Sequence, residues 1–133
     1  MIRNCLALAV VALATGTAPA AVVTNVVEYE HDGTKLKGFL AFDDALKGKL
    51  PGVLVVHEWW GLDDYARERC KQLAALGYVA FAVDMYGEGK TVNHPDDARK
   101  MATTVRENVK AWRGRAEVGL KQLTSQPNVD GTK

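Results

Sequence analysis

Residues 52–64 read Gly-Val-Leu-Val-Val-His-Glu-Trp-Trp-Gly-Leu-Asp-Asp, and this stretch decides the fold. Its first part, Val53–His57, is a short apolar run rich in β-branched side chains, which is typical of a strand buried on both faces. A loop with charged, aromatic and glycine residues follows at once, and an amphipathic helix starts near Asp63 and Asp64. Because ligands bind beyond the carboxyl ends of strands in an open parallel sheet, the stretch predicts a functional loop at such an edge.

The helix after this loop leads into a second strand. Over about 64–76, small and apolar residues recur at the spacing of one helix face. Asp63 or Asp64 is suited to cap its start, and Gly77 suits the left-handed position after its end. Tyr78–Val83 then predicts a second buried strand. A strand, a helix and a strand within about thirty residues form a βαβ unit, whose crossover is right-handed.

Two segments with a strand pattern precede this unit. Val22–Glu30 and Thr34–Phe42 are rich in β-branched residues or alternate between apolar and polar ones, and His31-Asp32-Gly33 joins them. Asp-Gly between two such runs is a strong signal for a hairpin. We therefore expect two antiparallel strands at an edge of the sheet, followed by a polar connection over Asp43–Pro51.

The remaining chain is predicted to be mainly helical. Asp84–His94 reads as a loop, and Pro95 suits the first turn of a helix. One apolar stripe then covers two helices or one bent helix, with Asn108 and Gly114 as the expected break points. Residues 126–131 predict a turn, with no strand after it. The predicted fold class is α/β: an antiparallel hairpin, then a βαβ unit with flanking helices.

Composition limits the classes of function. A chain of 133 residues, with 47% apolar and 25% charged residues, is that of one ordinary globular domain. Its formal net charge of +1 does not favour a nucleic-acid-binding or membrane-binding protein. His57-Glu58 begins like the zinc-binding HExxH motif, but the second histidine would be residue 61, which is glycine. No metal and no cofactor are therefore expected.

Residues 1–20 have the pattern of a signal peptide. Arg3 supplies a positive start, Cys5–Ala14 an apolar segment of ten residues, and Ala18-Pro19-Ala20 a small-residue cleavage site. Ten apolar residues are too few to span a bilayer as a helix. The pattern predicts a periplasmic or secreted protein whose mature domain, 21–133, does not contact a membrane. A buried strand or core helix over the same residues is the less favoured alternative.

Glu58 is the clearest candidate in this chain for a residue with a chemical role. It directly follows the predicted buried strand and precedes Trp59 and Trp60, a position where loss of water contact raises the pKa of a carboxyl group. Backbone N–H groups of the same loop can form half of an oxyanion hole. From chemistry alone, a structural glutamate paired with a basic side chain is an equally weighted alternative.

Four spaced motifs agree in order and context with one known family: His57–Leu62, Gly77–Ala80, Asp84–Gly87 and Gln126–Asp130. They resemble the dienelactone hydrolase family, a branch of the α/β-hydrolases, and the resemblance runs from about Val26 to Lys133. It implies an incomplete α/β-hydrolase-like sheet. It also implies hydrolysis of a small-molecule ester or lactone through an acyl-enzyme, with a Cys-His-Asp triad.

The resemblance also implies roles for three residues of the loop. Glu58 matches the glutamate that contacts the nucleophilic cysteine and helps to convert it to thiolate. The backbone N–H of Trp59 matches the first oxyanion donor, and Trp60 matches an aromatic residue that lines the substrate pocket.

The sequence departs from the family at the nucleophile. In the family this cysteine lies between glycines at the end of the next strand, which would begin after Lys133. Cys70 lies on the apolar face of a predicted helix, so we expect it to be a core thiol. We therefore expect the amino-terminal part of a hydrolase, inactive by itself.

Two further hypotheses belong to other classes. The first is a non-catalytic domain that binds a small ligand or a partner through the Glu58-Trp59-Trp60 loop, because two exposed tryptophans can hold an apolar or sugar-like ligand. The second is a piece that does not fold stably, because the missing neighbour of Val53–His57 would leave the edge of a buried strand exposed.

Overall fold

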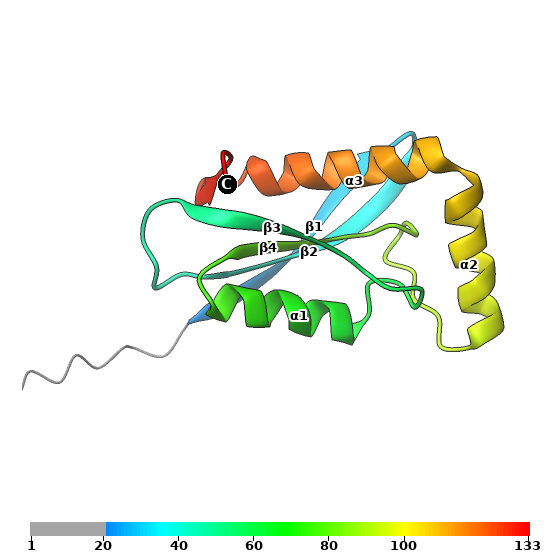
Figure 1. Ribbon diagram of the computed structural model, residues 1–133, viewed down its shortest axis with the longest axis horizontal. Coiled ribbons are helices and arrows are strands. Elements are labelled where there is room, and N and C mark those ends of the chain that lie inside the picture. Colours follow the sequence, from blue (N-terminus) through cyan, green and yellow to red (C-terminus); the bar gives the residue numbers. More distant parts are fainter. Residues whose placement is uncertain (1–20) are drawn as a thin grey trace, which may run out of the picture.

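The computed structural model describes residues 21–133, which form a five-stranded mixed sheet with helices on both faces (Figure 1). The predicted signal peptide, 1–20, lies outside the described residues. The strands are β1 (Val22–His31), β2 (Thr34–Asp43), β3 (Leu50–Val56), β4 (Val79–Val83) and β5 (Val129–Asp130), and the helices are α1 (Asp64–Ala75), α2 (Pro95–Glu107) and α3 (Val109–Thr124).

The order of strands across the sheet is β1-β2-β4-β3-β5. β1 and β2 are antiparallel, as are β2 and β4, whereas β3 runs parallel to both β4 and β5. In Figure 1, α1 covers one face of the sheet and α3 the other, while α2 stands at one end. This arrangement confirms the predicted α/β class, with a hairpin followed by a βαβ unit.

The hairpin forms where its turn residues predict it. His31 at the end of β1 pairs with Thr34 at the start of β2, which leaves Asp32 and Gly33 as a two-residue loop. Both loop residues have positive φ, 47° and 71°, as the favoured hairpin turns of type I′ require. The turn therefore fixes the register of the long β1–β2 pair.

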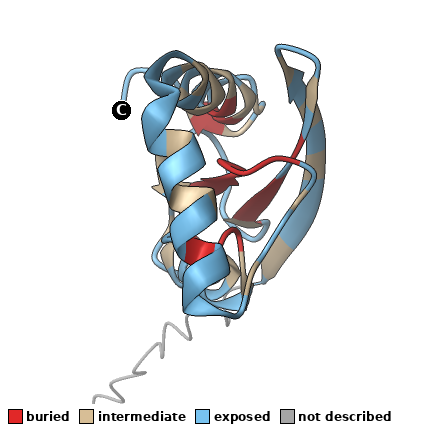
Figure 2. Cartoon of the chain, turned by 90° about the vertical axis from the view of Figure 1, so that its right-hand side faces the viewer, coloured by how far each residue is buried: buried red, intermediate tan, exposed pale blue. Residues whose placement is uncertain are grey.

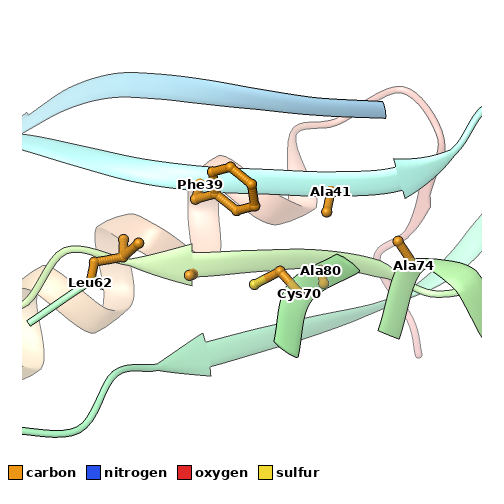
Figure 3. Packing of buried hydrophobic residues seen from close by; sticks show 7 residues of the cluster. Phe39, Ala41, Leu62, Cys70, Ala74 and Ala80 are labelled. Carbon is orange, nitrogen blue, oxygen red and sulfur yellow. The ribbon is translucent and has the colours of Figure 1, made fainter. Parts of the chain in front are cut away.

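Helix α1 has the predicted caps and the predicted buried face. The carboxylate of Asp63 accepts the backbone N–H of Ala66 at 3.1 Å, and Gly77 follows the helix with a φ of 94°. On the buried face, Cys70 and Ala74 pack against strands β2 and β4 (Figure 3). Cys70 is fully buried, so the predicted core thiol is confirmed, and this burial raises the pKa of the thiol to about 11.

The central strand of the sheet is β4, whose five residues are all buried. β3 was expected to be buried on both faces and to reach His57, but it ends at Val56 and is only partly buried, with Val56 51% exposed. The reason lies in its other neighbour, because β5 pairs only with Leu50 and Pro51. Within the described residues, the rest of that edge of β3 has no strand beside it.

Strand β5 corrects the prediction of a turn without a following strand. Val129 and Asp130 pair in parallel with the start of β3, and Val129 is 2% exposed in a cluster with Leu123 and Phe81. Two residues are too few to show a period in the sequence, which is why the pattern did not reveal this strand. The chain thus reaches the next strand position of the sheet before Lys133.

The long apolar stripe folds as two helices that meet at Asn108, as predicted. The Asn108 side chain accepts the N–H of Ala111 at 3.1 Å and so caps α3. Gly114 is not a break: it lies within α3, where a Cβ atom would collide with the ring of His31. Helix α2 faces the viewer in Figure 2 and is largely exposed. None of the helices between residues 21 and 133 is long and apolar enough to cross a membrane.

Candidate active site

The loops that follow β3 and β4 leave the sheet side by side. Val56 pairs in parallel with Val83, so the segments that begin at His57 and Asp84 start at the same edge of the sheet. Together with α2 and α3 they line a pocket of about 250 Å³. The loop that carries Glu58 therefore lies at the carboxyl end of a parallel strand pair, as the sequence predicts.

Glu58 lines this pocket with an exposed side chain. The expected burial of its carboxylate is therefore wrong, because β3 itself is open to solvent at this end, as the exposed Val56 shows. The alternative of a structural ion pair also fails within the described residues, since Glu58 forms no salt bridge there. The carboxylate is free to meet a group that enters the pocket.

The two tryptophans of the loop lie close together but line different pockets. Their ring centroids are 5.0 Å apart and their planes are inclined by 60°. Trp59, which is 40% exposed, shares the pocket of Glu58 and Trp112. Trp60 instead lines a separate pocket of about 600 Å³ with Asp63 and other residues. The structure thus brings Glu58 and Trp59 together and sets Trp60 beside them.

The backbone N–H of Trp59 donates to no group among residues 21–133. The carbonyl groups around it are all engaged. Glu58 O lies 2.6 Å from Nδ1 of His57 and also accepts the N–H of Gly61 at 3.3 Å. Trp59 O accepts the Tyr86 hydroxyl at 2.7 Å, and Trp60 O accepts the N–H of Val92 at 3.0 Å. The loop therefore keeps its oxygens occupied and the Trp59 N–H available to a ligand.

His57 is a functional candidate that sequence reasoning treated only as part of a motif. Its Nε2 atom accepts the backbone N–H of Met85 at 3.1 Å, so the ring proton lies on Nδ1 and is donated to Glu58 O. Burial lowers the pKa of His57, which favours this neutral form. Both ring nitrogens are engaged, so His57 orients the loop instead of acting as a free base.

Asp84 holds the second loop in place. The carboxylate is fully buried and accepts four backbone N–H groups, with two bonds to each oxygen. The donors are Lys37 at 3.0 Å, Tyr86 at 3.1 Å, Gly87 at 2.7 Å and Gly89 at 2.8 Å. These amide dipoles stabilise the buried negative charge. An acidic residue directly after a fully buried strand was the sequence signal for this role.

Among residues 21–133, no cysteine, serine or threonine lines the pocket of Glu58. Cys70 is fully buried in α1 and faces the sheet, away from the pocket of Glu58. His31 and His94 do not line that pocket either. Across residues 21–133, no group of three or more His, Cys, Asp or Glu side chains is placed to hold a metal ion.

The mixed sheet, its βαβ unit and the Glu58 loop at the carboxyl edge of the parallel strands match a partial α/β-hydrolase-like fold. The chain belongs to the dienelactone hydrolase family, because the sequence model of that family matches residues 36–133. The resemblance seen in the spaced motifs is thereby confirmed, and the protein is hydrolase-like.

Individual relatives agree with this assignment. "Protein usf" of Aquifex pyrophilus is 45% identical over 87 residues, which are 63% of this chain and 36% of that protein. The solved structure of m3DLH has 37% identity and a TM-score of 0.79 over 83% of this chain and 46% of its own. A dienelactone hydrolase-like promiscuous phosphotriesterase from metagenomic libraries has 35% identity and a TM-score of 0.80 over 85% of this chain and 47% of its own. The chain thus matches less than half the length of these relatives.

Proposed function

We propose that this chain supplies part of the active site of a carboxylic ester or lactone hydrolase. The observation that carries the proposal is the pair formed by the exposed, unpaired Glu58 and the unengaged N–H of Trp59, side by side at the mouth of a pocket. A carboxylate and a free backbone donor at the carboxyl edge of a parallel sheet suit acyl transfer. The substrate is a small molecule with an ester or lactone bond.

The proposed roles divide the chemistry between these two groups. Glu58 takes the proton of a thiol and so generates the thiolate that attacks the ester carbonyl. The carbonyl oxygen becomes negatively charged, and the Trp59 N–H donates to it. One such donor contributes on the order of a hundredfold to a thousandfold in rate. Trp60 contacts an apolar part of the substrate from the neighbouring pocket of about 600 Å³.

The thiol and its histidine come from outside residues 21–133, because no described residue is placed to provide them. We therefore propose that these residues have no ester turnover by themselves. We further propose that residues 1–20 direct export and that the mature protein is periplasmic or secreted. Fractionation of cells that express the chain, with amino-terminal sequencing of the exported form, tests this location; a cytoplasmic protein that retains Met1 contradicts it.

A chimera tests the catalytic proposal. Residues 21–133 replace the matching segment of m3DLH, and hydrolysis of p-nitrophenyl acetate is followed. We expect turnover by the chimera, a strong loss in Glu58→Gln, and no loss in Glu28→Gln, a matched change at an exposed glutamate. Turnover by residues 21–133 alone, or a Glu58→Gln chimera as active as its parent, would contradict the proposal.

A second candidate function is ligand binding without catalysis. The exposed faces of Trp59 and Trp112, 40% and 43% exposed, line the same pocket and could hold an apolar or sugar-like ligand. Titration of small esters and sugars against tryptophan fluorescence separates the two candidates. A tight, specific and saturable response with no turnover in the chimera favours binding.

A further inference from the structure

We infer that His57, as its Nδ1–H tautomer, is a positioning residue that turns the backbone N–H of Trp59 toward the substrate pocket. The inference rests on the proposed function, because that function makes the Trp59 N–H an oxyanion donor. It goes beyond it by naming the side chain that sets the direction of this donor. His57 itself touches no reacting atom in this scheme.

The argument begins with the peptide group between Glu58 and Trp59. In a planar trans peptide, the C=O and the N–H point to opposite sides. The oxygen of this group lies 2.6 Å from Nδ1 of His57, and it also accepts the N–H of Gly61 in a longer contact of 3.3 Å. The N–H of Trp59 therefore points away from His57, and no described residue accepts it.

The direction of the His57 ring is itself fixed by two contacts. The N–H of Met85 can only donate, so its 3.1 Å contact requires a lone pair on Nε2 and places the proton on Nδ1. The ring of Tyr86 packs edge-on against the imidazole, with centroids 4.8 Å apart and an interplanar angle of 69°. With the ring orientation and the tautomer both fixed, the hydrogen bond that Nδ1 makes within residues 21–133 is to the oxygen of Glu58.

Such a fixed donor has a catalytic consequence. A backbone N–H that already points at the position of the developing oxyanion needs no reorganisation during the reaction, which is why preorganised donors are effective. The next peptide group of the loop has a separate anchor, because the hydroxyl of Tyr86 donates to Trp59 O at 2.7 Å. His57 and Tyr86 thus act on neighbouring peptide groups, and this separation provides a matched control.

The tautomer is measured first, on the 133-residue chain labelled with ¹⁵N. A long-range ¹H–¹⁵N spectrum of the imidazole rings at pH 7 shows which nitrogen carries the proton. We expect His57 to have a protonated Nδ1 and an unprotonated Nε2. A proton on Nε2, or rapid exchange between the two tautomers, overturns the inference without any variant.

Two substitutions then separate the two bonds of His57. In His57→Asn the side-chain amide nitrogen replaces Nδ1 and can still donate to Glu58 O. In His57→Gln the amide oxygen replaces Nε2 and can still accept from Met85, while the side-chain donor to Glu58 O is lost and only the longer Gly61 N–H contact remains. We expect the ¹H–¹⁵N amide signal of Trp59 to move several-fold more in His57→Gln than in His57→Asn. Equal movement in both variants contradicts a positioning role.

Tyr86→Phe is the matched control, because it removes only the anchor of the next peptide group. We expect it to move the amide signal of Trp60 more than that of Trp59, the reverse of His57→Gln. The amide signals of β4 serve as the internal check of folding, since all five of its residues are buried. If a variant does not fold, the His57 tautomer measured on the unaltered chain still tests the inference. None of these readouts uses turnover. A chimera without esterase activity would therefore overturn the proposed function and the oxyanion role of the Trp59 N–H, while the positioning of this N–H by His57 would still be tested separately.

Discussion

The hydroxyl group of Tyr86 donates a hydrogen bond of 2.7 Å to the carbonyl oxygen of Trp59, and this bond joins the loop after β4 to the loop after β3. Tyr86 is 8% exposed, and burial raises the pKa of its hydroxyl, so the group stays a donor. The contact spans 27 positions of the sequence. It shows that the candidate site is held together across the sheet edge and not only within one loop.

Removal of this hydroxyl in Tyr86→Phe should lower the free energy of unfolding by about 1 kcal/mol, the usual net value of one hydrogen bond. Urea unfolding followed by circular dichroism measures the change. Tyr65→Phe is the control, because Tyr65 is 53% exposed and its hydroxyl only accepts from Arg69 on the surface. We expect its effect to stay within about 0.5 kcal/mol. Equal effects of the two substitutions would show that the Tyr86 bond adds no stability.

Asp84→Asn should be more damaging. Its carboxylate accepts four backbone N–H groups, two on each oxygen, in a fully buried position. Asparagine keeps one acceptor oxygen and directs an NH₂ group at two donors, which leaves those donors unsatisfied. We expect a loss of about 3 kcal/mol or more, since each buried unsatisfied donor costs about 1–3 kcal/mol. The matched change at the exposed Asp44 should have little effect in the same unfolding experiment.

Local chemistry explains which parts of the fold could be predicted. The hairpin followed from Asp32-Gly33, because few residue pairs accept two positive φ angles, and α1 followed from its period and its cap at Asp63. The position of Glu58 followed from the order of strand, loop and helix. All three depend on neighbours in the sequence.

The features that sequence reasoning missed depend on distant partners. The exposure of Glu58 reflects how little of β3 is covered by β5, and a strand of two residues has no period to detect. The anchors of the site join His57 to Met85 and Tyr86 to Trp59, which are 28 and 27 positions apart. The spacing of residues within one loop cannot predict contacts between residues so far apart in the sequence.

The close packing of β2 on β4 predicts a strong effect of Gly38→Ala. A Cβ atom at Gly38 would lie 2.9 Å from Cε1 of Phe81 and closer still to the tip of the ring, and Phe81 is fully buried. The fully buried ring would have to shift against its neighbours, so we expect destabilisation of about 1–3 kcal/mol. Gly131→Ala, where the added atom would meet nothing within 4 Å, is the control. Thermal unfolding of both variants compares them, and an unchanged melting temperature in Gly38→Ala would refute the packing argument.

Acid should lower the free energy of unfolding because of the buried ring of His57. Burial lowers the pKa of this residue below its ordinary 6.5, while its Glu58 backbone bond and the charges of Asp84 and Asp63 partly oppose the shift. Below pH 6.5 the unfolded chain therefore binds a proton that the folded chain excludes, so this part of the stability is present above pH 6.5 and is lost as the pH falls. Urea unfolding at several pH values between 7 and about 5 should show a smaller decline in His57→Gln, which cannot titrate. The same decline in both proteins would assign it to other groups.

The thiol of Cys70 should be nearly inert in the folded protein. The side chain is fully buried, and burial raises its pKa from 9.0 to about 11, so little thiolate forms near neutral pH and reagents cannot reach it. In a Cys5→Ser background, we expect slow modification by Ellman's reagent at pH 8 and complete, fast modification in urea. A Ser125→Cys thiol, at an exposed position, is the control and should react at once. The raised pKa of Cys70 also makes stability depend on pH. Between pH 9 and about 11 the unfolded chain loses the thiol proton first, so the free energy of unfolding falls as the pH rises. Fast labelling of Cys70 in the folded state would mean that α1 separates readily from the sheet.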